Sequence, residues 1–305
     1  MYLLSLATAS PRNTYTQQDC FNIFADSEAR KRLKQRSVTI MEKVLLRDNG
    51  IHSRRFSYPD VETIFDAGPE KLNNVFEQEA PALGSDALRS AMDKAKLSPS
   101  DVDALVVCTC TGYLCPGLSS FIAEQTGLKP NCELSDLVGM GCGAAIPSLR
   151  TAYHRLQANP ELKVAVVAVE ICSAAFYLDD DPGVIISACL FGDGAAATIW
   201  SGTPPPFPTW EAGLFDSLHI PGTGSCCGLR MQVGPCATGL ADVFLKKRQQ
   251  PSGAFSSIPS RWSKVQLPHA SFPIQEAGTS STPSGRNLTG TRFPIAGPFY
   301  MILAT

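Results

Sequence analysis

The sequence predicts a layered α/β fold, and three observations lead to this prediction. Continuous apolar runs rich in valine occur at residues 102–110 and 164–169, as expected for strands of a sheet that is covered on both faces. Segments with apolar residues at helical spacing separate these runs. Glycine-rich turns lie at residues 139–143 and 192–194, where they permit sharp bends and close packing. Strands that alternate with helices in this way are typical of α/β domains.

The segments before the central turn each have a distinct pattern. Residues 2–9 predict a first strand, which a Ser-Pro pair ends. Residues 28–47 carry apolar residues at roughly helical spacing with Lys and Arg between them, and Asn49 with Gly50 breaks this pattern. The other predicted elements are helices at residues 16–24, 79–96 and 118–125 and strands at residues 102–110 and 133–138.

The most informative stretch covers residues 134–150 and has the sequence L-S-D-L-V-G-M-G-C-G-A-A-I-P-S-L-R. It predicts a strand, a tight glycine turn and a helix over residues 146–157, with Cys142 on the first helical turn. A helix N-terminus offers unpaired N–H groups and a positive dipole end, which stabilise a thiolate. Cys142 is therefore either an activated nucleophile or, as is common for free cysteines, a buried packing residue.

Bulk properties exclude several classes of function. A chain of 305 residues allows one large domain or two smaller ones, and its net charge of -2 argues against nucleic-acid binding. The chain contains no apolar run of about 18 residues, so we expect no membrane span. The opening residues lack the basic flank and cleavage pattern of a secretory leader, so we expect the cysteines to be reduced thiols in a cytoplasmic protein.

Two smaller features have competing interpretations. Cys108 and Cys110 lie on one face of a predicted strand, but no second Cys or His pair has zinc spacing, so we predict no metal site. Residues 51–56 are locally basic through Arg54 and Arg55. These side chains form either a solvated surface, which this segment alone favours, or contacts to a phosphate-bearing ligand.

Four motifs then occur in order along the chain. They are V-V-C-T-C-T-G-Y-L-C-P-G, V-G-M-G-C-G-A, V-A-V-E-I-C-S and A-C-L-F-G-D-G-A-A-A. In this order and spacing, they resemble the motifs of the chalcone-synthase-like, or type III, polyketide synthases of the thiolase superfamily, over residues 3–219. The resemblance implies a layered α-β-α-β-α thiolase-like fold, a homodimer, and acyl transfer from coenzyme A thioesters with no further cofactor.

The resemblance also implies roles for individual residues. Cys142 would take an acyl group from an acyl-CoA starter, and malonyl-CoA would extend it by decarboxylative condensation. Phe191 falls on a gatekeeper position at the mouth of the reaction cavity, where a core aromatic residue would fit equally well. Cys115 falls where plant members carry a residue that reaches into the cavity of the partner subunit. The cations expected to bind coenzyme A are Lys43, Arg47, Arg54 and Arg55.

Two catalytic residues of the family are missing. The family uses a histidine in an H-P-G-G motif and an asparagine in a G-N-x-S-S motif to activate the cysteine and bind the oxyanion, and neither motif occurs here. After Ile220 the chain is rich in Pro, Ser, Thr and Gly, as poorly ordered segments are. We expect residues 1–219 to form the first half of the fold and residues 220–305 to be an aberrant tail. Such a chain would be inactive or poorly folded, or it would be acylated only slowly at Cys142.

A change of reading frame would explain the tail. When allowed codons for residues 273–286 are read from the third base, one result contains H-P-G-G. The same treatment of residues 222–238 gives a sequence with L-R-F-E and L-R-N, as in the family. Both segments use the same shifted frame and keep the family order. We therefore hypothesise that the frame changes between residues 218 and 222.

Two other functions are compatible with parts of the sequence. A ketoacyl synthase of the fatty-acid type shares the thiolase fold, although the G-Y-L-C-P-G and L-F-G-D-G-A-A-A motifs favour a polyketide synthase. A non-catalytic remnant with an interaction role fits the missing histidine and asparagine. An activated Cys142 would react with iodoacetamide below pH ~7, whereas an inert thiol would not.

Overall fold

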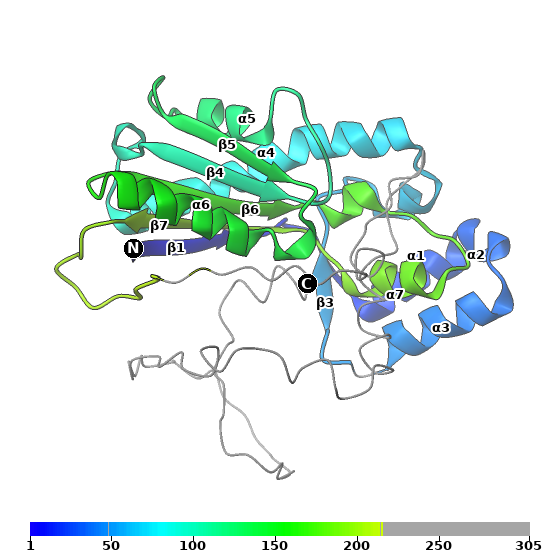
Figure 1. Cartoon of the computed structure of the whole chain (residues 1–305). Helices are drawn as coiled ribbons and strands as arrows, with labels where there is room; N and C mark the ends of the chain where they lie inside the picture. The colour runs from blue at the N-terminus through cyan, green and yellow to red at the C-terminus, as the bar shows by residue number, and fades with distance from the viewer. Residues whose placement is uncertain (48, 214, 216–305) are drawn as a thin grey trace, which may run out of the picture.

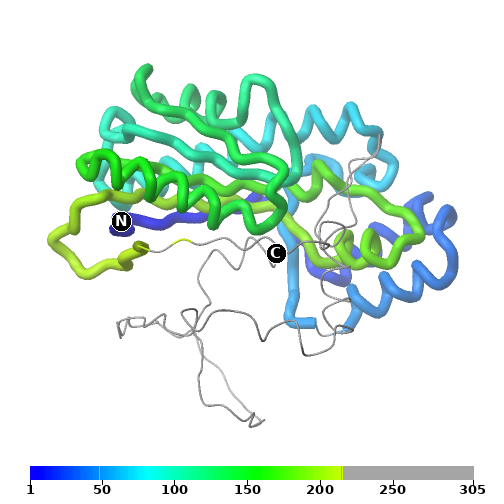
Figure 2. Tube along the Cα trace, viewed as in Figure 1, coloured from blue at the N-terminus to red at the C-terminus, as the bar shows by residue number. Residues whose placement is uncertain are grey.

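A five-stranded sheet forms the middle layer of the computed structural model, which describes residues 1–47, 49–213 and 215. The strand order is β1-β7-β6-β4-β5, with β4 parallel to β5 and β6, and with β7 antiparallel to β6 and β1 (Figure 1). The strands are β1 (Tyr2–Ala9), β4 (Ala104–Thr109), β5 (Glu133–Val138), β6 (Lys163–Glu170) and β7 (Gly194–Ser201). The first strand of the chain thus pairs with the last described one, as Figure 2 shows.

Helices cover both faces of this sheet (Figure 1). The long helix α4 (Pro69–Ala95) and α5 (Leu118–Thr126) lie on one face, and α6 (Ala145–Ala158) lies on the other. Leu105 and Val107 of β4 belong to the core beneath α4, whereas the alternate residues of the same strand pack with α6. The valine-rich runs are therefore buried on both sides, which confirms the layered α/β prediction.

A group of smaller elements lies beside the ends of β4, β5 and β6 (Figure 1). Helix α3 packs against both α1 and α7, and β2 pairs with β3 in a separate two-stranded sheet. The elements of this group are β2 (Thr14–Thr16), α1 (Gln17–Asp26), α2 (Ala29–Arg32), α3 (Gln35–Leu46), β3 (Ser53–Arg55), the 3₁₀ helix η1 (Val61–Asp66), η4 (Cys172–Ala175) and α7 (Pro182–Leu190).

The structure corrects the prediction of one helix over residues 28–47. The backbone is extended at Leu33 and Lys34, and this break separates α2 from α3. A carboxylate oxygen of Asp180 accepts hydrogen bonds from the Lys34 backbone N–H (2.9 Å) and the Ser37 hydroxyl (2.7 Å). An acidic residue from a distant loop thus accepts hydrogen bonds from the unpaired donors at the start of α3. Local periodicity could not indicate this contact.

Two further helices differ from the expectation. The predicted helix over residues 79–96 begins ten residues earlier, at Pro69, and includes Pro81 within it. Helix α7 was not predicted because it is apolar all round and has no helical stripe. Its local signals were Asp181, whose side chain accepts from the N–H groups of the first turn, and Pro182 at the first helical position.

None of the helices in the described part of the chain combines the length and apolar character needed to cross a bilayer. The proposed boundary at residue 219 and the tail at residues 220–305 lie outside the described residues.

Candidate active site

The candidate site lies where three parallel strands end. Thr109 of β4 is in register with Val138 of β5, and Cys108 of β4 is in register with Ala168 of β6. Because these strands run in the same direction, the segments that follow them emerge at one edge of the sheet. This edge therefore brings together residues from three segments that are far apart in the sequence, because β4, β5 and β6 end at residues 109, 138 and 170.

A glycine turn places Cys142 at this edge. Gly139 and Gly141 have φ angles of +73° and +67°, in the left-handed region that other residues rarely adopt. The chain then forms the 3₁₀ turn η3 (Gly141–Gly143) and enters α6. Cys142 is half-buried in this turn, just before the helix rather than on its first α-helical turn.

The thiol of Cys142 has a cysteine partner. A hydrogen bond from the Cys110 side chain lowers the pKa of Cys142, although burial and the nearby Glu170 act in the opposite direction. The pKa of Cys110 is raised, first by the same hydrogen bond and then by burial. Of the two thiols, Cys142 therefore has the lower pKa and ionises first.

The carboxyl group of Glu170, a half-buried residue, contacts the backbone of Cys110. Its two oxygens accept hydrogen bonds from the Cys110 backbone N–H at 2.9 and 3.0 Å. Burial raises the pKa of Glu170. Sequence reasoning missed both Glu170 and the role of Cys110, and the available signal was that each lies at the end of an apolar parallel strand.

Phe191 follows the last turn of α7 and is partly buried. Its backbone N–H donates to the carbonyl oxygen of Ser187 (3.1 Å), and its own carbonyl accepts from Arg54 (3.1 Å). Asp193, two residues on, is buried among the hydrogen-bond donors of Ser57 and Ser173. The position of Phe191 is thus fixed by a network that extends into β3.

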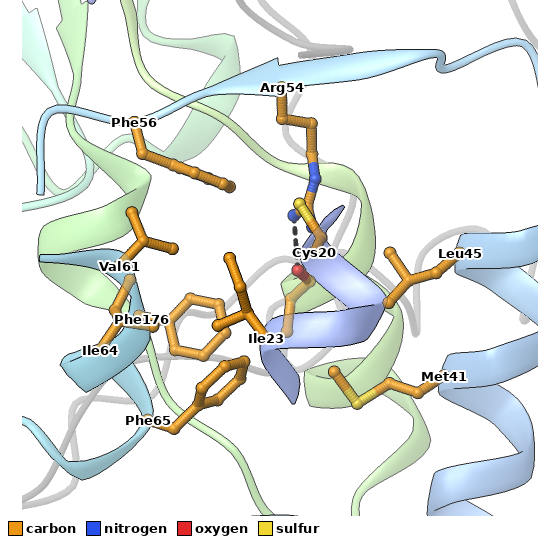
Figure 3. Close-up of a pocket in the computed structure, with 11 residues that line it drawn as sticks. Cys20, Ile23, Met41, Leu45, Arg54, Phe56, Val61, Ile64, Phe65 and Phe176 are labelled. Atoms are coloured by element: carbon orange, nitrogen blue, oxygen red, sulfur yellow. Dashed lines mark hydrogen bonds between the residues drawn. The ribbon is translucent and has the colours of Figure 1, made fainter. Parts of the chain in front are cut away.

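The four predicted coenzyme-binding cations do not form one group. Lys43, Arg47 and Arg55 are exposed, but Arg54 is only 5% exposed. Figure 3 shows the Arg54 side chain running from β3 into the protein, toward Cys20. Arg54 also borders a small cavity of about 20 Å³, whose lining residues do not include Cys142.

Cys115 is exposed and lies in the loop between β4 and α5. The far end of this loop is anchored by Asp136 of β5, whose carboxylate accepts from the Ser119 backbone N–H (2.9 Å). A Cβ atom at Gly117 would come within 2.2 Å of an Asp136 carboxylate oxygen, so the loop and β5 are in close contact. Cys115 is thus presented to solvent at the same edge as Cys142.

No histidine in the described part of the chain serves Cys142. His52 and His154 are both exposed, and neither contributes to the pKa of Cys142. Within the same residues, no group of three His, Cys, Asp or Glu side chains is arranged to hold a metal ion. Among the described residues, the candidate site therefore consists of Cys142, Cys110 and Glu170.

The fold is that of the type III polyketide synthases. It matches the crystal structure of 1,3,6,8-tetrahydroxynaphthalene synthase from Streptomyces coelicolor with a TM-score of 0.64 and 23% sequence identity. The match covers 77% of this chain and 66% of that one. The thiolase-like fold expected for the first half is thereby confirmed.

The chain belongs to the FAE1/type III polyketide synthase-like protein family, whose model matches residues 1–206. It is 28% identical over 197 residues to a 1,3,6,8-tetrahydroxynaphthalene synthase from Streptomyces griseus. The aligned segment covers 64% of this chain and 52% of the synthase. It is 29% identical over 198 residues to a 3,5-dihydroxyphenylacetyl-CoA synthase from Streptomyces toyocaensis, or 64% and 48% of the two chains. The chain thus spans about half the length of the curated relatives it matches.

Proposed function

We propose that this protein derives from a type III polyketide synthase and that Cys142 is its acyl-accepting nucleophile. The observation that carries the proposal is the half-buried Cys142 in a left-handed glycine turn, with its pKa lowered by the Cys110 thiol. Family membership supplies the reaction class, which is acyl transfer. Acyl transfer to a cysteine needs a thiolate of this kind.

The first step would be acylation. The Cys142 thiolate attacks the thioester carbonyl carbon of an acyl-CoA, the bond from that carbon to the coenzyme sulfur breaks, and the released coenzyme A thiolate takes up a proton. Malonyl-CoA would then lose carbon dioxide, and its enolate carbon would attack the acyl carbon and displace the Cys142 sulfur. The second step creates an oxyanion that the missing histidine and asparagine would have stabilised, so we expect loading without efficient extension.

We further expect the family's homodimer, with Cys115 near the partner's cavity, and a cytoplasmic location. We expect no cofactor other than the coenzyme A thioesters. The exposed Lys43, Arg47 and Arg55 are the candidates for contacts to the coenzyme phosphates, because compact and forked cations suit such groups.

Acyl loading is the direct test. The full chain is incubated with hexanoyl-CoA, and the thioester is located by peptide mass spectrometry. We expect an adduct on Cys142 and its loss in Cys142→Ser, with Cys132→Ser as the matched control because Cys132 is a partly buried cysteine outside the site. An adduct confined to other cysteines would refute Cys142 as the nucleophile.

A further inference from the structure

The C-terminus of α7 ends against a buried cation. The last carbonyl groups of a helix have no partner within it and carry partial negative charge. Arg54 Nη1 donates to the carbonyl oxygens of Ala188 (2.6 Å) and Phe191 (3.1 Å). Gln17 Nε2 donates to the carbonyl oxygen of Cys189 (3.2 Å). Arg54 and Gln17 thus supply hydrogen-bond donors to the carbonyl groups at the C-terminus of α7, which Phe191 follows directly.

The guanidinium group of Arg54 makes further contacts inside the protein. Its Nε donates to Gln17 Oε1 (3.0 Å), and its central carbon lies 5.0 Å from the centroid of the Phe56 ring. A buried cation is stable only where hydrogen bonds and polarisable neighbours replace water. The inward direction in Figure 3 and the 5% exposure leave Arg54 poorly placed to meet a phosphate group from solvent.

Asp193 holds the other side of the same turn. Its carboxylate accepts from the Ser57 backbone N–H (2.6 Å) and from the Ser173 backbone N–H (2.8 Å) and hydroxyl (2.5 Å). Its backbone N–H donates to the Arg55 carbonyl oxygen (2.9 Å). At Gly192 a Cβ atom would lie 3.2 Å from that carbonyl oxygen, so the turn packs closely on β3.

We propose that Arg54 and Asp193 are positioning residues that fix the Phe191 turn from its two sides. Arg54 anchors the helix that precedes Phe191, and Asp193 ties the segment after it to β3 and η4. The role of Phe191 as a gate rests on the proposed function, but the anchoring of its turn does not. We therefore no longer expect Arg54 to bind coenzyme A, because its guanidinium group contacts the C-terminus of α7.

The test reports on Phe191 directly. 4-Fluorophenylalanine is incorporated at position 191 of the full chain, and its ¹⁹F resonance is recorded in the parent and in Arg54→Met and Asp193→Asn. We expect a single narrow line in the parent and a shifted line, broadened at least twofold, in both variants. Arg54→Lys keeps the charge without the forked donors and is expected to restore the parent spectrum in part.

Matched controls are Arg36→Met and Asp86→Asn, which alter exposed side chains and should leave the ¹⁹F line unchanged. The proposal is overturned if Arg54→Met and Asp193→Asn give the same line position and width as these controls. If Arg54→Met does not fold, Arg54→Lys and Asp193→Asn decide the question by the same criterion.

A second measurement separates positioning from ligand binding. Coenzyme A is titrated calorimetrically into the parent and Arg54→Lys. We expect unchanged affinity in Arg54→Lys together with the altered ¹⁹F line. Weakened binding with an unaltered ¹⁹F line would show that Arg54 is a ligand and refute the proposal. Failure of Cys142 to accept an acyl group would refute the proposed function and leave the ¹⁹F result standing.

Discussion

The side chains of Cys110 and Cys142 interact at the edge of the sheet, and this interaction lowers the pKa of Cys142 while it raises the pKa of Cys110. The pair joins the turn after β5 to the residue after β4, so it exists because parallel strands end at a common edge. Cys142 thus interacts with a residue that lies 32 positions away in the sequence.

Removal of the Cys110 thiol should make Cys142 less acidic. In Cys110→Ala the stabilising donor is lost, and we expect the pH profile of Cys142 alkylation to move upward by roughly 1 pH unit, since one hydrogen bond contributes about 1 kcal/mol. The measurement is the iodoacetamide rate at Cys142, resolved by peptide mass spectrometry between pH 6 and 10. Cys110→Ser retains a donor and is the control; a profile that is identical in all three proteins contradicts the proposed pairing.

Asp193 should make the free energy of unfolding fall as pH rises from about 4 to 6. Burial, the largest effect, raises the pKa of Asp193 to about 6 from the ordinary 3.8, against the hydrogen bonds from Ser173 and Ser57 and with a smaller contribution from Glu79. Between these pH values the folded protein binds more protons than the unfolded chain, so deprotonation disfavours folding. The full effect is about 3 kcal/mol.

Asp193→Asn should abolish this part of the pH dependence, as measured by urea unfolding of parent and variant at pH 4.5 and 7.5. The raised pKa of Glu170 gives a slope of the same sign, but it is present in both proteins and cancels in the difference. Equal pH slopes in parent and variant would mean that Asp193 titrates normally in the folded protein.

Gly112→Ala should destabilise the fold by about 1–3 kcal/mol because the added methyl group has no room. A Cβ atom at Gly112 would lie 2.4–2.5 Å from three atoms of the Phe76 ring, which is buried. Thermal or urea unfolding measures the loss. Gly213→Ala, where the residue is exposed and nothing lies within 4 Å of the added atom, should change stability by less than about 0.5 kcal/mol; similar losses in both variants would rule out the steric explanation.

Tyr58→Phe should leave stability unchanged or raise it by about 1 kcal/mol. Tyr58 is fully buried and its hydroxyl has no hydrogen-bond partner among the described residues. Deleting an unsatisfied buried hydroxyl removes a desolvation penalty while the ring and its packing are kept. Urea unfolding provides the measurement, and a loss of more than 1 kcal/mol would reveal a partner for the hydroxyl.

Sequencing the transcript from codon 218 to the stop codon should reveal the frame that encodes H-P-G-G. A protein made from that frame would regain the histidine, so we expect it to convert acyl-CoA and malonyl-CoA into extended products that the present chain does not form. If no single-base change or alternative splice site restores H-P-G-G, the frame hypothesis is abandoned, and activity has to come from the first half alone.

Several features could be predicted from the sequence because their causes are local. Strand and helix periods of two and 3.6 residues placed β1, β4, β6 and α5 within about two residues. The glycines at 139 and 141 required a special backbone conformation, and they put Cys142 at the start of a helix. Motif order then identified the family over the same segments.

The contacts of individual polar side chains were decided by tertiary structure. Arg54 and Arg55 are adjacent and indistinguishable by pattern, yet one is buried at the end of α7 and the other is exposed. Likewise, only the common edge of the parallel strands brings Cys110 to Cys142. Local periodicity fixes which face a residue occupies, but the free energy of a buried charge or thiol depends on groups that packing delivers from distant segments. Local sequence patterns were therefore sufficient to predict the fold and the turn that carries Cys142, whereas the groups that surround this thiol depend on tertiary packing.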